Sequence, residues 1–245
     1  MDKVVAVIQA RMGSARLPGK VLKEIGGKSI LEILVNRLKS SRRINSIIVA
    51  TTEGKEDDKI VELARKLGVE WYRGSEDDVL KRFIDASSAT NADIIVRVTA
   101  DNPLTDPELV DELIVAHFKN QADYTHCTGA PLGIGAEVVN KEILEKIAPI
   151  AKEPEYTEHV TFYIVDHPEL FRIHTIKAEE LGLNYPDLRL TVDTEEDLEL
   201  MRKLQENLGD LERLEIREVI EFLSAHPEIR EINAQIKQKI PKVIV

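Results

Sequence analysis

The residues best suited to chemistry in this chain lie in one short cationic loop near the N-terminus. Between Lys3 and Lys23 the sequence has five basic residues and no acidic one, although the whole chain carries a formal net charge of −11. Glycines let backbone N–H groups approach an anion closely, a serine hydroxyl adds a donor, and arginine and lysine supply positive charge. Such a loop suits the charge of a triphosphate. The residues behind this prediction are Arg11, Gly13, Ser14, Arg16, Gly19 and Lys20.

An ordinary basic surface loop is the alternative interpretation of this segment. The loop directly follows an apolar run at residues 4–8, and that position, the glycine spacing and the absence of acids favour anion binding. The segment is not a P-loop, because it lacks the pattern Gly-x-x-x-x-Gly-Lys-Ser/Thr. It also lacks the Gly-x-Gly-x-x-Gly pattern of dinucleotide-binding folds.

A parallel sheet is the element that would position this loop. Strand-like apolar runs alternate with amphipathic helical segments through the first half of the chain, which predicts the α/β class with helices on both faces of a mostly parallel sheet. Strands are predicted at residues 4–8, 46–51, 69–72 and 94–99. Helices are predicted at 30–39, 57–67, 77–89 and 107–119, the last with Asp106 as its N-cap.

The pattern changes after residue 120. Predicted strands at 124–127, 137–140 and 171–177 and helices at 141–150 and 156–166 indicate an inserted arm or a sheet extension over residues 120–180. A late strand at 188–192 precedes a helix that Thr194 caps and that runs to Leu208. We predict one domain over residues 1–245, in which residues 210–245 form peripheral helices and a basic tail with Lys237, Lys239 and Lys242.

Two aspartates fall at the ends of predicted strands, where open α/β sheets bind their ligands. Asp101 follows the strand at 94–99, and Asp193 follows the strand at 188–192. Carboxylates there suit Mg²⁺, which neutralises the charge of a reacting triphosphate. The alternative roles are a turn residue before Asn102-Pro103 for Asp101 and a capping residue beside Thr194 for Asp193. The residues alone leave both roles open.

Two more predicted strand ends bring further candidates to this edge. Thr51 ends one strand, and Arg73-Gly74-Ser75 ends the next. Ser75 also begins a Ser-x-x-Asp pattern, so a helix cap and a part in nucleotide recognition both remain open for it.

The loop at residues 9–20 resembles the signature loop of the sugar-acid cytidylyltransferases, enzymes that make CMP-activated sugars, and is most similar to their spore-coat polysaccharide branch. Further blocks resemble family blocks in family order, so that the resemblance covers residues 4 to about 200. These blocks lie at residues 73–80, 97–104, 158–161 and 192–198.

The resemblance implies a three-layer nucleotide-binding fold of the glycosyltransferase-A type with a small β-containing extension. It implies transfer of CMP from CTP to a sugar acid with release of pyrophosphate, for surface polysaccharide or glycan biosynthesis, by a homodimer that uses Mg²⁺. Arg11, Lys20 and Asp101 would be catalytic, and Asp101 and Asp193 would hold the metal. The nucleotide would contact Ala10, Arg11, Gly13, Ser14, Arg16, Lys20, Thr51, Arg73, Gly74 and Ser75.

The acceptor side is less clearly marked. Glu137 and His159 lie in blocks that the resemblance places near the acceptor, although a lone histidine on a helix, as His159 is predicted to be, is more often structural. Gly135 stands where the family often has an aspartate, which weakens inference about the acceptor. Another nucleotidyltransferase or a glycosyltransferase of the same fold, and a non-catalytic nucleotide-binding subunit, remain alternative functions.

Composition narrows the protein class. With 43% hydrophobic and 31% charged residues, the chain is typical of a globular protein. The single cysteine, Cys127, forms no intramolecular disulfide, and a strand predicted after Met1-Asp2-Lys3 leaves no room for a signal peptide. We therefore expect a cytoplasmic protein. The acidic net charge and the absence of a ~20-residue apolar stretch argue against nucleic-acid and membrane partners.

Overall fold

Seven strands form the central sheet of the computed structural model, which describes residues 2–238, in the order β5-β4-β1-β6-β8-β7-β9. Only β8 runs antiparallel to its neighbours, β6 and β7. This topology confirms the predicted mostly parallel α/β class. The strands are β1 Val4–Gln9, β4 Ser46–Thr52, β5 Glu70–Gly74, β6 Ile94–Thr99, β7 Tyr124–Thr128, β8 Glu137–Asn140 and β9 Ile173–Lys177; a separate small hairpin joins β2 Glu24–Ile25 to β3 Lys28–Ser29.

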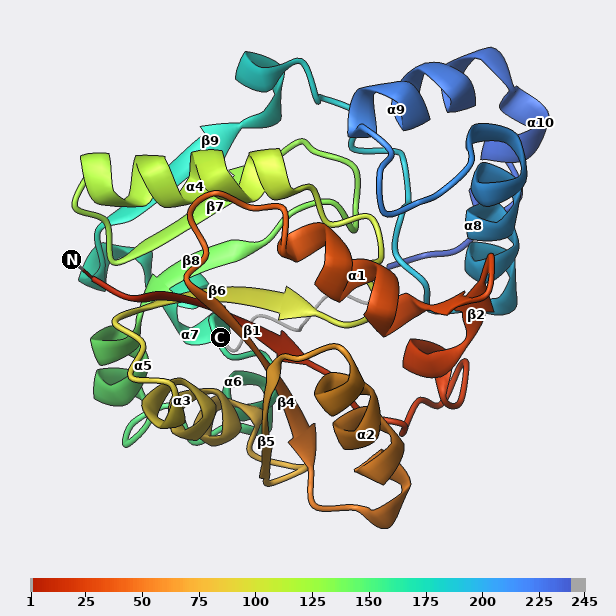
Figure 1. Cartoon of the computed structure of the whole chain (residues 1–245). Coiled ribbons are helices and arrows are strands. Elements are labelled where there is room, and N and C mark those ends of the chain that lie inside the picture. Colours follow the sequence, from red (N-terminus) through yellow and green to blue (C-terminus); the bar gives the residue numbers. More distant parts are fainter. Residues whose placement is uncertain (1, 239–245) are drawn as a thin grey trace.

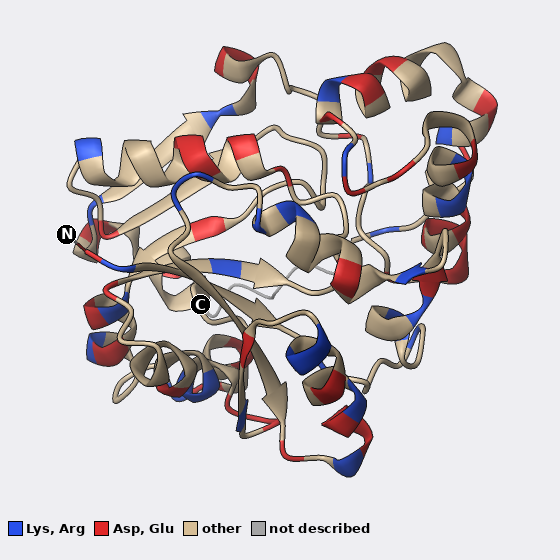
Figure 2. Cartoon of the chain, viewed as in Figure 1, with Lys and Arg blue, Asp and Glu red and all other residues tan. Residues whose placement is uncertain are grey.

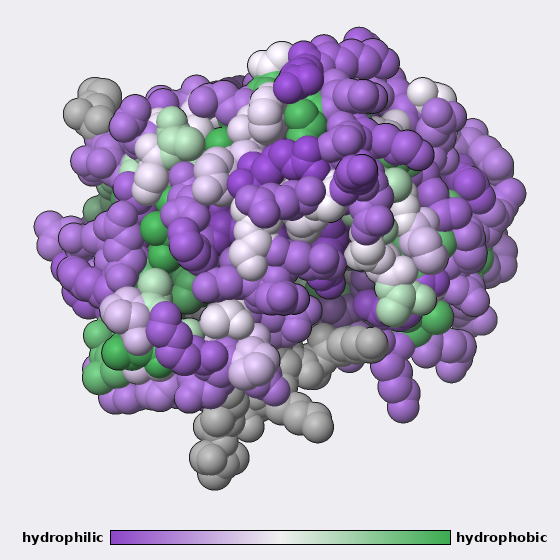
Figure 3. Space-filling model, turned by 90° about the horizontal axis from the view of Figure 1, so that it is seen from below, coloured by the Kyte–Doolittle hydropathy of each residue, from purple (hydrophilic) through white to green (hydrophobic). Residues whose placement is uncertain are grey.

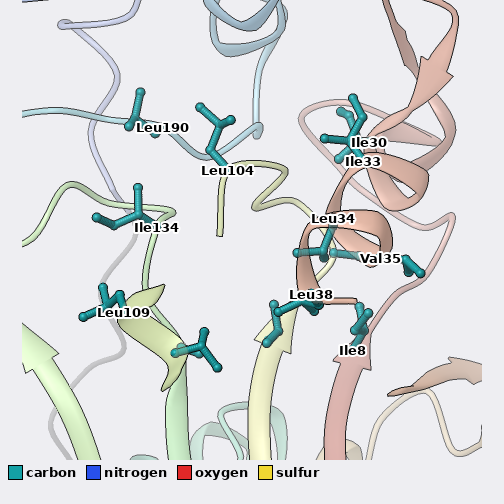
Figure 4. Close-up of a cluster of buried hydrophobic side chains, with 14 of the residues drawn as sticks. Ile8, Ile30, Ile33, Leu34, Val35, Leu38, Leu104, Leu109, Ile134 and Leu190 are labelled. Carbon is teal, nitrogen blue, oxygen red and sulfur yellow. The ribbon is translucent and has the colours of Figure 1, made fainter. Parts of the chain in front are cut away.

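Helices cover both faces of the sheet because the buried strands are apolar on both sides (Figure 1). In β1, Ala6 and Ile8 point into one core, whereas Val5 and Val7 point into the other. Figure 4 shows part of the first core, where Ile8 lies beside Leu38 of a covering helix. That core includes α1 Ile30–Leu38, α2 Asp58–Lys66, α4 Pro107–Lys119, α8 Glu195–Leu208 and α9 Ile216–Ala225; the second includes α3 Val79–Ala89, α5 Lys141–Ile147, α6 Pro154–Glu158 and α7 Phe162–Asp166.

Residues 120–180 extend the main sheet through β7, β8 and β9. The single helix predicted at 156–166 is wrong: α6 ends at Glu158 and α7 begins at Phe162. In the break, the Thr161 hydroxyl donates a hydrogen bond to Glu137 of β8 at 2.8 Å. The apolar pattern continues from α6 into α7, but the helix itself is interrupted where Thr161 contacts the sheet.

The strand predicted at 188–192 is also wrong. Leu188, Leu190 and Val192 are buried, as the apolar pattern required, but the segment lies outside the seven-stranded sheet. Its backbone bonds to a loop instead, with Leu190 N donating to Leu132 O at 2.7 Å. Val192 N also donates to Asp101 O at 2.8 Å, so this segment is fastened to the end of β6.

The segment after residue 210 does more than cover the surface. α9 buries Ile216, Val219 and Leu223, and beyond α10 (Pro227–Arg230) the buried Asn233 side chain donates to Arg189 O at 3.0 Å. Lys237 of the predicted basic tail is exposed, whereas Lys239 and Lys242 lie outside the described residues.

The outer surface is polar and of mixed charge. Figure 2 shows Lys and Arg interspersed with Asp and Glu over the outer helices, and Figure 3 shows that apolar residues on the face seen from below form small separate patches. Within residues 2–238, none of the helices combines the length and the apolar character that crossing a bilayer requires.

Candidate active site

The cationic loop after β1 is fastened to the neighbouring strand by Asp57, a buried residue that the sequence analysis missed. One Asp57 carboxylate oxygen accepts a hydrogen bond from Met12 N at 2.7 Å, and the other accepts from the Thr52 hydroxyl at 2.5 Å. Gly19 closes the loop with a φ of +66°, and its N–H donates to Met12 O at 2.9 Å. Few residues other than glycine adopt that φ at low cost. The loop therefore leads directly into Lys20.

Lys20 links the two aspartates predicted to hold a metal. Its Nζ lies 2.6 Å from Asp101 Oδ2 and 2.7 Å from Asp193 Oδ1. The ammonium is largely buried, with 13% of the Lys20 side chain exposed. The other Asp101 oxygen accepts from the Thr99 hydroxyl at 2.6 Å. The structure thus brings the end of the cationic loop, the end of β6 and the segment before α8 to one place.

Asp193 is held by a second layer of charges. Arg189 Nη2 donates to Asp193 Oδ2 at 2.7 Å, and Arg189 Nε donates to Asp197 at 2.8 Å. Burial would raise the pKa of Asp193, but the Lys20 hydrogen bond and the Arg189 and Arg16 charges lower it on balance, so the carboxylate is ionised at neutral pH. Thr194 caps α8 in a capping box with Asp197, which fixes the backbone on the C-terminal side of Asp193.

The other loop residues differ in how freely they face a ligand. Asp101, Asp193 and the Lys20 ammonium between them form what we call the carboxylate centre. Arg16 Nη2 lies 3.0 Å from Asp193 Oδ1, so Arg16 also contacts this centre. Arg11 is 3.4 Å from Glu76 and half-exposed, while Gly13 is exposed beside Glu76. The Ser14 hydroxyl accepts from Leu17 N at 3.2 Å and thereby shapes the loop itself. Ala10 is buried at the end of β1.

Residues 73–75 make more hydrogen bonds within the protein than the sequence indicated. The Arg73 guanidinium bonds to Thr52 O at 2.8 Å, to Gly54 O at 2.6 Å and to Asp58 at 2.5 Å, so its hydrogen bonds all lie in residues 52–58. Thr51 is fully buried at the end of β4. The contacts of Thr51 and Arg73 with a nucleotide therefore stay predictions.

Ser75 does not cap α3. The helix begins at Val79, and its N-cap is Asp78, whose side chain accepts from Lys81 N at 2.8 Å; the Ser75 hydroxyl instead accepts from Asp78 N at 3.0 Å and orders the preceding turn. The buried Arg82 donates to the Ser75 carbonyl, and a Cβ at Gly74 would come 3.1 Å from Arg82 Cγ. The Gly74–Ser75 turn therefore packs against Arg82 and bonds to it, and Arg82 is a residue that the sequence did not single out.

A pocket of about 280 Å³ adjoins the carboxylate centre. It shares Thr99 and Asn102 with the Asp101 surroundings, since Asn102 Nδ2 donates to Thr99 Oγ1 at 3.0 Å and Thr99 donates in turn to Asp101. Its lining includes the ion pair between Arg97 Nη1 and Glu137 Oε2 at 2.6 Å. A larger pocket of about 920 Å³ lies among α1, α4 and α9, but none of the predicted site residues lines it.

The hydrogen bonds of this ion pair are unequal. Glu137 accepts from Tyr124 at 2.7 Å, from Thr161 at 2.8 Å and from Arg97, whereas within residues 2–238 Arg97 donates only through Nη1 and its Nε is buried without a partner. Burial would raise the pKa of Glu137, but the Arg97 charge and these hydrogen bonds lower it on balance. The pocket lining therefore includes a carboxylate with three hydrogen-bond donors and an arginine whose charge suits ligand oxygen atoms.

His159 is not on a helix, in contrast to our prediction. It follows the last residue of α6, and its ring packs edge-on against Phe162 at 6.4 Å between centroids. Burial lowers the pKa of His159, which favours a neutral imidazole at pH 7. Since Thr161 contacts Glu137, the loop that carries His159 passes beside the pocket without contributing His159 to its lining.

The donor set at the carboxylate centre fits Mg²⁺. Within the described part of the chain, no cluster of three or more His, Cys, Asp or Glu side chains could hold a metal by itself. Mg²⁺, however, is commonly bound through one or two carboxylates, with water and substrate phosphates completing the shell. Asp101 and Asp193 supply two such hard oxygen ligands beside a loop suited to phosphates.

A cationic loop and two carboxylates beside a pocket at the carboxyl edge of a mostly parallel sheet are typical of a nucleotidyltransferase, an enzyme that transfers a nucleotide to an acceptor oxygen. Residues 5–218 match the family model of the cytidylyltransferases, so the chain belongs to that family.

Individual relatives agree with this assignment. The chain is 42% identical over 233 residues to the spore coat polysaccharide biosynthesis protein SpsF of Bacillus subtilis, covering 93% of this chain and 97% of that protein. A solved cytidylyltransferase structure from Leptospira borgpetersenii is 33% identical with a TM-score of 0.89, covering 98% and 99% of the two chains. The chain is also 34% identical over 121 residues to 3-deoxy-manno-octulosonate cytidylyltransferase of Geobacter sulfurreducens, covering 49% and 47%. These findings confirm the resemblance stated from the sequence.

Proposed function

We propose that the protein transfers CMP from CTP to the hydroxyl of a sugar acid and releases pyrophosphate. The observation that carries this proposal is the junction of three parts at one sheet edge: the cationic loop, the Asp101–Lys20–Asp193 centre and the pocket lined by Arg97. Membership of the cytidylyltransferase family supports CTP as the donor. The partial relative named for an octulosonate supports a sugar acid as the acceptor, and SpsF supports a role in polysaccharide synthesis.

In the proposed reaction, the acceptor oxygen forms a bond to the α-phosphorus as the bond from that phosphorus to the bridging oxygen of pyrophosphate breaks. The hydroxyl proton is released. Arg11, Arg16 and Lys20 would bind the β- and γ-phosphates and stabilise the charge that develops on the leaving pyrophosphate. Bound at Asp101 and Asp193, Mg²⁺ would supply further neutralisation of phosphate charge. The protein acts mainly by positioning and electrostatics.

The Arg97 pocket is the proposed site of the acceptor. The Arg97 guanidinium would recognise acceptor oxygens, and Glu137, which already accepts from Arg97, Tyr124 and Thr161, would position Arg97 instead of contacting the sugar. A carboxylate of the acceptor would gain a charge-assisted hydrogen bond there. His159 would act only through the loop that holds Thr161 against Glu137.

Product analysis tests this function. The enzyme is incubated with CTP, Mg²⁺ and either sugar acids, including 3-deoxy-manno-octulosonate, or sugar 1-phosphates, and the products are analysed by mass spectrometry. We expect a CMP–sugar adduct and one equivalent of pyrophosphate with a sugar acid. Products formed only from sugar 1-phosphates would assign the chain to a different nucleotidyl transfer.

A further inference from the structure

The Lys20 ammonium occupies the position between the two carboxylates that suit a divalent cation. Lys20 Nζ is 2.6 Å from an Asp101 oxygen and 2.7 Å from an Asp193 oxygen, and the three side chains have exposed fractions of 13%, 23% and 9%. These contacts are direct, partly buried hydrogen bonds between full charges, which bulk solvent screens only weakly. Before any ligand binds, the gap between the two carboxylates is therefore filled by a cation that belongs to the protein itself.

A divalent cation and this ammonium cannot both use the same gap. A metal coordinated by Asp101 Oδ2 and Asp193 Oδ1 would lie within a few ångströms of Nζ, and the repulsion between the two cations would be large at this low exposure. Moving Lys20 away without a new anion would in turn leave an ammonium without its two hydrogen-bonded partners. A metal alone supplies no such anion, whereas a polyphosphate supplies several.

Lys20 differs from the neighbouring cations in this respect. Arg16 touches only Asp193 within the pair, through Nη2 at 3.0 Å, and Arg189 touches Asp193 on its opposite oxygen, Oδ2. Lys23 pairs with the exposed Glu195 at 2.9 Å. Lys20 alone among the described residues bridges both aspartates, and it follows Gly19 on a flexible four-carbon side chain that can turn towards the loop.

We propose that Lys20 is an interlock that keeps the metal position closed until a polyphosphate draws its ammonium away from Asp101 and Asp193. Divalent cations then enter together with the polyphosphate or after it, and not before. The same lysine is freed to bind phosphate as the carboxylates are freed to bind metal. The inference rests on the proposed function only in requiring that a polyphosphate binds at the cationic loop.

Manganese binding followed by water proton relaxation tests the interlock without any catalysis. Mn²⁺ attached to a slowly tumbling protein enhances relaxation more than free Mn²⁺ or free Mn²⁺–triphosphate. For the wild-type protein we expect little enhancement with Mn²⁺ alone and a clear enhancement after inorganic triphosphate is added. Equal enhancement with and without triphosphate would overturn the proposal.

Variants supply the control for simple loss of charge. Lys20→Met is expected to bind Mn²⁺ without triphosphate at least ~10-fold more tightly than wild type, whereas Arg16→Met, which removes a cation from Asp193 only, should gain less than ~3-fold. Adding Asp101→Asn to Lys20→Met should abolish the gain. Equal gains in the two single variants, or a gain that survives the Asp101 change, would contradict the interlock.

These outcomes separate the interlock from the proposed function. Inorganic triphosphate carries neither base nor sugar, so a wrong assignment of CTP or of the acceptor leaves the relaxation result unchanged. A failed interlock, conversely, leaves CMP transfer measurable by product analysis. The wild-type arm needs no variant and holds even if Lys20→Met does not fold.

Discussion

Asp101 and Asp193 both contact the Lys20 ammonium, but their surroundings differ and indicate different roles. Asp101 is 23% exposed, and among residues 2–238 its carboxylate bonds only to Lys20 and the Thr99 hydroxyl. Asp193 is 9% exposed and contacts three cations, Lys20, Arg16 and Arg189. Removing the first carboxylate therefore disturbs few contacts, whereas the second also holds the protein together.

Paired asparagine variants separate these roles. Asp101→Asn keeps the size and most hydrogen bonds, so it should leave the melting temperature nearly unchanged while pyrophosphate release falls by roughly 10²–10³. Asp193→Asn removes the anion that Lys20, Arg16 and Arg189 share and should lower the free energy of unfolding by about 2–4 kcal/mol. The loss is limited because Asp197 still pairs with Arg189.

Thermal unfolding and pyrophosphate release on both variants give the answer. A loss of stability without loss of activity in Asp101→Asn would return Asp101 to the turn residue that the Asn102-Pro103 context also predicts. Mg²⁺ titration of the Asp101→Asn variant should need a higher Mg²⁺ concentration for half-maximal rate, because the metal affinity falls.

At the scale of elements, the segment at 188–192 decides whether Asp193 can reach Lys20. It is held by the loop before β8, where Gly133 has a φ of +101° and a Cβ there would come within 2.5 Å of the Leu190 carbonyl. The backbone hydrogen bond from Leu190 N to Leu132 O lies next to this close approach. Two segments that are far apart in sequence therefore depend on one glycine.

Gly133→Ala should destabilise the protein by more than ~3 kcal/mol, because a strained φ costs about 1–3 kcal/mol and the backbone clash adds to it. Gly68→Ala is the matched control, since Gly68 has a φ of +67° with open space around its Cβ position. It should cost only about 1 kcal/mol. Equal losses in denaturant unfolding of the two variants would show that the contact with Leu190 contributes nothing.

Elements that the sequence predicted well have a local cause. β6, β8, α4 and α9 follow local apolar patterns, and β6, β8 and α4 have the predicted bounds. The segment at 188–192 was misread because burial on all sides gives an irregular segment the same apolar run as a strand. The break between α6 and α7 was missed because the Thr161–Glu137 contact that accompanies it is tertiary.

The candidate site divides in the same way. The cationic loop and Asp101 were found because glycine spacing and position after a strand are local signals. Asp57, Arg82, Arg97 and Arg189 were missed as site residues because their importance comes from partners between 4 and 45 residues away. A charged side chain inside the otherwise apolar run of β6 is the signal that would have singled out Arg97.

At the scale of the whole molecule, two ionised carboxylates make stability depend on pH. The pKa values of Glu137 and Asp193 are lowered by folding from ordinary values of 4.5 and 3.8. Their stabilisation is therefore fully present above those values and is lost as the pH falls through the lower folded-state pKa values. We expect the melting temperature to fall steeply below about pH 4.5.

Glu137→Gln isolates one of these contributions. Its melting temperature should lie below that of the wild type at pH 7, and the difference should shrink as the pH falls below the ordinary glutamate value of 4.5 and through the lower folded-state pKa of Glu137, where the wild-type carboxylate becomes protonated. A difference that stays constant across this range would mean that the Arg97–Glu137 charge pair does not stabilise the fold.

The most direct test of the central claim is nucleotide selectivity, measured as the shift in melting temperature with Mg²⁺ and CTP, UTP, GTP or ATP. A ligand at about 100 times its Kd stabilises the native state by about 2.7 kcal/mol, a shift that thermal unfolding resolves readily. We predict that CTP raises the melting temperature more than the other three nucleotides at equal concentration. An equal or larger shift with GTP, UTP or ATP would contradict the assignment of this chain as a CTP-dependent cytidylyltransferase.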